Sequence, residues 1–171
     1  MNFAATQIDS LLDRMAEQLR EHFQQHRRDR LAIVGIHSGG AWIAAELQQR
    51  LNPDWPLGSL DISFYRDDFG KRGLNPSVKR TELPFSVDEQ HLLLVDDVLM
   101  SGRTVRAAMN ELFDFGRPAS VSLAVLFDVG RRELPIRADV CGETLALEPH
   151  QRVQLHGPAP LRAEITDTGT Q

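Results

Sequence analysis

The feature that most constrains this chain is a short apolar run that ends in two adjacent carboxylates. Leu92 to Val95 form a continuous apolar segment, which is typical of a strand buried on both faces of a parallel sheet. Asp96 and Asp97 follow at once, and burying such charges without partners is costly. We therefore expect the pair at the carboxyl end of the strand, facing a cleft or solvent. In open α/β sheets, that edge is where ligands bind.

A turn of small residues follows the carboxylates and leads into a helical pattern. Ser101 to Thr104 form the turn, and apolar residues then recur at helical spacing from Val105 onward. Gly102 lets the backbone approach a ligand closely, and the first amides of a helix have no partners inside that helix. The turn is therefore a candidate phosphate nest with Arg103 as a counter-charge, and the adjacent carboxylates suit the hydroxyls of a ribose 5-phosphate. The alternative is a solvated strand end with an N-capping serine.

The rest of the chain alternates between strand and helix patterns. The expected elements are a helix over residues 7–24, a strand over 31–36, a helix beginning near 42, a half-exposed strand over 60–65, the strand of 92–95 and a buried strand over 121–127. Glycine-bearing turns separate strands from helices, as in βαβ units. This order predicts an α/β fold with a central, mainly parallel sheet flanked by helices.

Composition sets the class of protein. The 171 residues suffice for one domain with a substantial core, and 42% hydrophobic with 25% charged residues is an ordinary soluble balance. The single Cys141 permits no internal disulfide, and neither a membrane-length apolar stretch nor a signal-peptide pattern occurs. We therefore expect a cytoplasmic protein. The net charge of −5 disfavours coating nucleic acid by bulk electrostatics.

Several motifs together resemble one known family. Residues 95–104 resemble the 5-phosphoribosyl-1-diphosphate (PRPP) motif of the type I phosphoribosyltransferases. Residues 105–109, 116–118 and above all Arg132 to Asp139, with the sequence Arg-Glu-Leu-Pro-Ile-Arg-Ala-Asp, resemble the PyrR family. Members of that family are bifunctional pyrimidine operon attenuators and uracil phosphoribosyltransferases. The resemblance implies the type I phosphoribosyltransferase fold, with a flexible loop over the site.

The resemblance also implies a reaction and a set of site residues. The reaction is uracil plus PRPP giving UMP and diphosphate, with Mg²⁺ carried by PRPP and no direct protein ligand to the metal. The implied residues are Asp96 and Asp97 as catalytic; Val98, Leu99, Met100, Ser101, Gly102, Arg103 and Thr104 as PRPP-binding; His37, Ser38, Gly39 and Gly40 as the pyrophosphate loop; and Arg131, Val140 and Cys141 as base-binding. The implied partners are PRPP, uracil, UMP, UTP and a pyr mRNA leader, and the implied assembly is a homodimer or higher homo-oligomer.

This chain departs from the family pattern at several of these positions. The pyrophosphate loop usually has lysine and arginine where His37 and Gly39 stand. An arginine is usual in place of Val129, and an aromatic residue in place of Val140. Met100 stands where 6-oxopurine phosphoribosyltransferases carry a carboxylate, which argues against a hypoxanthine or guanine enzyme. The alternative to an active enzyme is therefore a nucleotide-sensing regulator with weak or lost transferase activity.

Two segments have little regular periodicity. Residues 66–80 form a long charged stretch, and the resemblance implies an arm over the site in which Lys71, Arg72, Lys79 and Arg80 shield the leaving pyrophosphate. The alternative is a solvated loop whose charges have no functional role. We expect one phosphoribosyltransferase-type domain over residues 1–157 and a flexible tail over residues 158–171, which offers little to bury.

Overall fold

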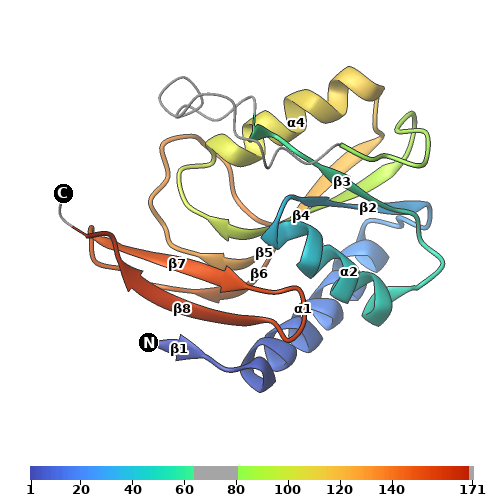
Figure 1. The fold of residues 1–171 in the computed structure, drawn as a ribbon. Helices are drawn as coiled ribbons and strands as arrows, with labels where there is room; N and C mark the ends of the chain where they lie inside the picture. Colours follow the sequence, from blue (N-terminus) through green and yellow to red (C-terminus); the bar gives the residue numbers. More distant parts are fainter. Residues whose placement is uncertain (64–80, 170–171) are drawn as a thin grey trace.

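A computed structural model of the chain describes residues 1–63 and 81–169. The elements are β1 (Asn2–Phe3), α1 (Ala5–Gln25), β2 (Leu31–Ile36), α2 (Gly39–Leu51), β3 (Leu57–Leu60), β4 (His91–Leu99), α4 (Arg103–Phe115), β5 (Ser120–Asp128), β6 (Val140–Thr144), β7 (Gln151–His156) and β8 (Arg162–Asp167). Five strands form a parallel sheet in the order β3-β2-β4-β5-β6. The expected α/β fold with a central parallel sheet is confirmed (Figure 1).

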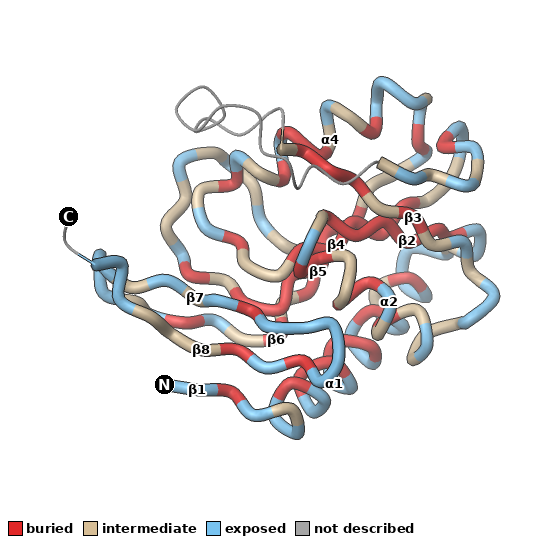
Figure 2. The backbone as a smooth tube through the Cα atoms, viewed as in Figure 1, coloured by how far each residue is buried: buried red, intermediate tan, exposed pale blue. Residues whose placement is uncertain are grey.

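Both faces of the parallel sheet are covered by helices. One core lies between the sheet and helices α1 and α2, and the other lies between the sheet and α4 (Figure 1). The residues of β4 alternate between them, with Leu93 and Val95 in the first core and Leu92 and Leu94 in the second. All four side chains are fully buried, and the central strands form the buried middle of the molecule (Figure 2). Two-sided burial explains why residues 92–95 are continuously apolar.

A second, smaller sheet packs beside the α1 face of the first. It is antiparallel, has the order β1-β8-β7, and joins the two ends of the chain (Figure 1). We call this three-stranded sheet the hood. The Phe3 ring lies 4.9 Å from the Phe127 ring of β5, and Gly157 packs against Trp42 of α2. These contacts seat the hood on the main core.

The expectation of a flexible tail over residues 158–171 is wrong for most of that segment. Residues 162–167 form β8, which pairs with β7 along its whole length and with β1 at its start. Leu161 is 7% exposed and Ala163 is 2% exposed, so the segment buries apolar side chains after all. Backbone pairing with distant strands, rather than local composition, orders this part of the chain.

The strand expected over residues 60–65 lies earlier in the chain. β3 ends at Leu60, and the residues that follow it up to Ser63 are outside the sheet. Asp61 is buried along with Leu60 and Ile62, so these residues do not alternate between buried and exposed; residues 64 and 65 of the expected strand lie outside the described residues. Among the described helices, none has the length and apolar character needed to cross a membrane.

Candidate active site

The carboxylate pair lies in the second half of β4, toward the carboxyl edge of the parallel sheet. Asp96 is 5% exposed and pairs with Val125 of β5, and the strand continues two residues past Asp97 to Leu99. The Asp97 amide donates to Asp96 Oδ1 at 2.9 Å, and the Val98 amide donates to Asp97 Oδ1 at 2.8 Å. Local backbone hydrogen bonds thus orient both carboxylates.

The turn after β4 has the geometry expected for a phosphate nest. Gly102 has φ of +93°, a left-handed conformation that favours glycine, and α4 begins at the next residue. The Arg103 amide donates to Ser101 Oγ at 3.1 Å. The amides of Thr104 and Val105 belong to the first helical turn, which supplies no acceptors inside the helix. The turn therefore presents amides and hydroxyls to one side, where an anion would bind.

Residues 132–139, with the sequence Arg-Glu-Leu-Pro-Ile-Arg-Ala-Asp, pack against this turn and donate hydrogen bonds to it. The amides of Glu133 and Leu134 donate to the Ser101 carbonyl at 3.0 and 3.1 Å. A Cβ at Gly102 would lie 3.2 Å from Ile136 Cβ, so the run packs directly on the glycine. Arg103 Nε also meets Glu133 Oε2 at 2.7 Å, although both side chains are about half exposed, so this ion pair adds little stability. The family-specific run therefore has a structural role at the PRPP motif.

Arg132 connects the same run to the end of β5. Its guanidinium donates to Asp128 Oδ2 at 2.5 Å, to the Ile136 carbonyl at 2.6 Å and to the Met100 carbonyl at 2.9 Å. Burial by itself raises the pKa of Asp128, but the hydrogen bonds from Arg132 and the Gly130 amide and the charge of Arg132 together lower it. Arg132 and Asp128 thus hold the segment after Leu99 in place.

This ion pair predicts a pH-dependent contribution to stability. A carboxyl whose pKa is lower in the folded state stabilises the fold above its unfolded pKa of about 3.9, and the contribution is lost as the pH falls through the folded value. Asp128→Asn should therefore lower the melting temperature at pH 7, and the difference from the unaltered protein should shrink below about pH 4. Thermal unfolding across this pH range measures it; a difference independent of pH would contradict the ion pair.

The predicted pyrophosphate loop, residues 37–40, lies against β4 and its carboxylates because two glycines allow close approach. A Cβ at Gly39 would lie 2.4 Å from Asp97 Oδ2, and one at Gly40 would lie 2.4 Å from the Val95 carbonyl oxygen. His37 Nε2 is hydrogen-bonded to Ser59 Oγ at 2.9 Å, and the peptide between His37 and Ser38 is cis. The glycine at position 39, where the family usually has arginine, therefore fits the close packing at this point, because a larger residue would displace the Asp97 carboxylate.

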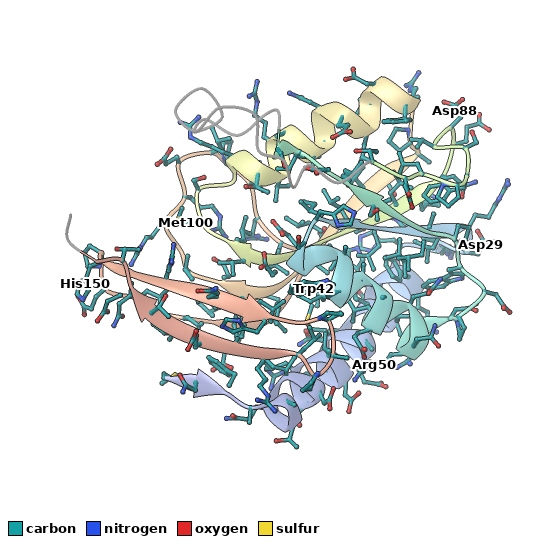
Figure 3. The ribbon with its side chains drawn as sticks, in the orientation of Figure 1. Asp29, Trp42, Arg50, Asp88, Met100 and His150 are labelled. Atoms are coloured by element: carbon teal, nitrogen blue, oxygen red, sulfur yellow. The ribbon has the colours of Figure 1, made fainter. Side chains whose placement is uncertain are left out.

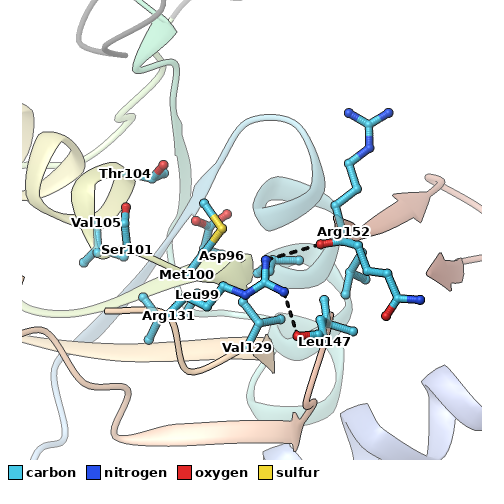
Figure 4. Close-up of a pocket in the computed structure, with 14 residues that line it drawn as sticks. Asp96, Leu99, Met100, Ser101, Thr104, Val105, Val129, Arg131, Leu147 and Arg152 are labelled. Atoms are coloured by element: carbon cyan, nitrogen blue, oxygen red, sulfur yellow. Dashed lines mark hydrogen bonds between the residues drawn. The ribbon is translucent and has the colours of Figure 1, made fainter. Parts of the chain in front are cut away.

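A cavity of about 220 Å³ lies between the hood and the turn of residues 101–104, which we call the PRPP turn after its predicted ligand. Its lining residues are Asp96, Val98, Leu99, Met100, Ser101, Gly102, Thr104, Val105, Val129, Arg131, Leu147, Gln151, Arg152 and Val153. Ser101 and Thr104 lie at one end, Leu147 and Arg152 at the other, and Asp96, Met100 and the side chain of Arg131 between them (Figure 4). The cavity thus has a hydroxyl-bearing end at the turn of residues 101–104, and next to the hood an end lined by both apolar and polar side chains.

The structure does not bring all the predicted base-binding residues to this cavity. Arg131 lines it, whereas Val140 is 5% exposed within the α1-side core and Cys141 packs against the α4-side core. Burial, together with the charge of Asp128, raises the pKa of the Cys141 thiol, so the thiol stays protonated at neutral pH and is a poor nucleophile. Val129, the departure from arginine, is 7% exposed and presents an apolar side chain to the cavity.

Four lining residues next to the hood had no predicted role. Leu147, Gln151, Arg152 and Val153 come from the end of the β6–β7 connection and from β7. Local sequence offers only the weak alternation of Val153 and Leu155 as a sign of this strand. The segment proposed to cover the site, with Lys71, Arg72, Lys79 and Arg80, lies outside the described residues.

Comparisons with known proteins agree with this geometry. Residues 4–150 match the family model described as phosphoribosyl transferase domain. The chain is 59% identical over 154 residues to a protein named Bifunctional protein PyrR from Pseudomonas paraeruginosa, covering 90% of this chain and 91% of that one. It is 54% identical over 158 residues to the protein of the same name from Pseudomonas fluorescens, covering 92% and 94%.

Solved structures support the fold independently of close sequence similarity. A hypoxanthine-guanine phosphoribosyltransferase from Bacillus anthracis superposes with a TM-score of 0.72 at 17% identity, covering 96% of both chains. At that identity the likeness concerns the fold alone. Together with the PRPP turn, the carboxylate pair and the PyrR relatives, these matches show that this chain belongs to the PyrR family of phosphoribosyltransferases.

Proposed function

We propose that this protein transfers the 5-phosphoribosyl group of PRPP to uracil, giving UMP and diphosphate. The observation that supports this most is the placement of three elements at one sheet edge: the Asp96 and Asp97 carboxylates, the Ser101 to Thr104 turn and the pyrophosphate loop. A ligand with a 5-phosphate, vicinal hydroxyls and a 1-diphosphate offers one group to each element. The apolar side chains of Val129, Leu147 and Val153, set beside polar groups, give the other end of the cavity a lining of the kind that would bind a base.

The residues would act mainly through position and charge. In the transfer, the bond from ribose C1 to the diphosphate oxygen breaks and a bond from C1 to a uracil ring nitrogen forms, while positive charge develops on the ribose. Asp96 and Asp97 would hold the ribose hydroxyls and favour this charge, and the amides of the 101–104 turn would fix the phosphate. The ring nitrogen also loses a proton, and we assign no side chain to that step.

Magnesium enters this proposal with the substrate. Within residues 1–63 and 81–169 there is no group of three or more His, Cys, Asp or Glu side chains that would hold a metal ion by itself. The donors present, two adjacent carboxylates facing a diphosphate site, fit Mg²⁺ that is bound mainly by the diphosphate of PRPP. When bound, the ion would neutralise the departing diphosphate.

A direct assay tests the transferase proposal. Purified protein, labelled uracil, PRPP and Mg²⁺ should yield labelled UMP, and omitting either PRPP or Mg²⁺ should abolish it. Hypoxanthine and guanine should give little product, because Met100 offers no carboxylate for a purine. Failure to form UMP with protein shown to be folded by circular dichroism would contradict the proposal.

A nucleotide-sensing regulator is the second candidate. The positions of Gly39, Val129 and Val140 carry neither the cations nor the ring of the usual pattern, and Val140 is committed to the core. This candidate keeps the ligand site but predicts weak turnover. It is favoured if UMP or PRPP raises the melting temperature while UMP synthesis stays at background, and it is dropped if neither ligand shifts the melting temperature.

Regulation through a pyr mRNA leader would be the other half of the bifunctional role. Three arginines on or near the PRPP motif already have partners within the protein, namely Arg103, Arg131 and Arg132. Arg106, Arg117 and Arg137 are exposed and are the candidates for phosphate contacts. Binding of leader RNA, but not of a scrambled RNA, at moderate salt would support the role, and equal or absent binding would remove it.

A further inference from the structure

The side chain of Arg131 crosses from the end of β5 to the hood. Its guanidinium donates to the Leu147 carbonyl at 2.7 Å, to the Gln151 carbonyl at 3.4 Å, and to the Glu148 carbonyl through a short hydrogen bond. Figure 4 shows the guanidinium beside the cavity, between Leu147 and the start of β7 at Arg152. All of these partners are backbone atoms, so Arg131 recognises the shape of the 147–151 turn rather than any side chain on it.

The turn held by Arg131 carries the hood's part of the cavity wall. Leu147 and Val153, on either side of the turn, line the cavity and are partly buried against the main core. The other anchor of β7 lies at its far end, where Gly157 packs on Trp42 of α2. Figure 3 shows Trp42 and His150 at opposite ends of the hood. Near the cavity, Arg131 therefore supplies a polar connection from the segment after β5 to the β6–β7 turn and the start of β7.

Arg131 and Arg132 are adjacent in sequence but contact different parts of the structure. Arg132 faces the PRPP turn through the carbonyls of Met100 and Ile136, whereas Arg131 faces the hood. Loss of the Arg131 side chain leaves the Arg132 contacts in place, so the phosphate end of the cavity should keep its geometry. The two ends of the cavity are in this way supported independently.

We propose that Arg131 is a positioning residue that holds the β6–β7 turn, and with it Leu147 and Val153, against the base end of the cavity. This rests on the proposed transferase function for its kinetic consequence. In this assignment Arg131 acts through the turn, because three of its five N–H donors serve carbonyls there. Without the Arg131 side chain, the wall formed by Leu147 and Val153 should become mobile. Binding of the base must then order the turn, which costs conformational entropy and lowers the affinity for the base.

Kinetics with both substrates test the positioning role. Arg131→Ala should raise the KM for uracil on the order of tenfold, as expected for lost charge-assisted hydrogen bonds, and should leave the KM for PRPP within about twofold. Arg131→Lys should recover part of the loss, since an ammonium can still donate to carbonyls of the turn. Arg162→Ala is the matched control, because Arg162 is an exposed arginine of the hood outside the cavity, and it should change neither constant. Equal changes in both KM values, or no change, would overturn the proposal.

Hydrogen exchange tests the same contact without catalysis. Arg131→Ala should speed amide exchange in the peptide covering residues 145–153, and it should leave the 92–105 peptide unchanged. Unchanged exchange in the 145–153 peptide overturns the proposal whatever the kinetics. If the unaltered protein makes no UMP, the transferase proposal fails by itself, and exchange together with the affinity for UMP, expected to fall in Arg131→Ala, decides the role of Arg131.

Discussion

Replacing Gly40 with alanine is expected to lower kcat/KM for PRPP on the order of a hundredfold, because about 1 Å of misplacement at a reacting centre has effects of that size. The new Cβ would lie 2.4 Å from the Val95 carbonyl oxygen and 2.9 Å from Asp96 Cα. Both are backbone atoms of β4, which is held between β2 and β5, so the pyrophosphate loop must move outward. Steady-state kinetics with PRPP as the varied substrate measure the effect.

The same substitution should cost some stability without preventing folding. Overpacking of this kind destabilises proteins by about 1–3 kcal/mol, which a urea titration detects. Gly169→Ala is the control, since nothing lies within 4 Å of the Cβ that it would add. Gly40→Ala protein with unaltered kcat/KM would show that the loop does not approach β4 as closely as described.

Asp97→Asn is expected to weaken PRPP binding by roughly 10- to 150-fold, the range that corresponds to losing a charge-assisted contact of about 1.5–3 kcal/mol. The fold should survive, because the asparagine Oδ1 can accept the Val98 amide as Asp97 does now. The amide is also nearly the same size as the carboxylate beside Gly39. What changes is the negative charge available to ribose hydroxyls and magnesium.

Calorimetric titration with PRPP and Mg²⁺ checks this expectation. Asp114→Asn provides the control, since Asp114 is exposed on α4 and outside the cavity, and the affinity of this variant should match the unaltered protein. An Asp97→Asn protein that binds PRPP as tightly as the control would mean that the carboxylate does not face the ligand.

The central sheet was predictable because its signals are local. The apolar segments at 31–36, 92–95 and 121–127 lie in strands β2, β4 and β5, and their burial on both faces accounts for the lack of alternation. The tight turn at residues 101–104 was likewise predictable, since Gly102 has the positive φ that it requires. In these segments, the residue types within a few positions of one another are enough to predict the local backbone conformation.

The hood was not predictable because its signals are distant in sequence. β1 has two residues and pairs with β8 near the other end of the chain, a contact that no local pattern reveals. β7 has an inward face of Gln151, Val153 and Leu155, in which one polar residue weakens the alternation. The wall of the cavity opposite the PRPP turn therefore came only from the structure.

The base end of the site shows the same limit at the level of single residues. Arg131 was expected to bind the base, but the structure engages its guanidinium with carbonyls of the β6–β7 turn. The backbone around Val140 was expected to contact the base; the structure pairs Val140 with Ala124 and places its side chain in the core. Which partners a long or apolar side chain finds depends on elements that meet only in the folded chain.

The central claim is that one edge of the parallel sheet holds a ribose 5-phosphate between the carboxylate pair and the PRPP turn. A crystal structure with UMP tests it most directly. The claim predicts the phosphate against the amides of residues 101–104, the ribose hydroxyls at Asp96 and Asp97, and the uracil ring between Val129 and the hood. UMP bound elsewhere, or a cavity left without nucleotide at saturating concentration, would contradict it.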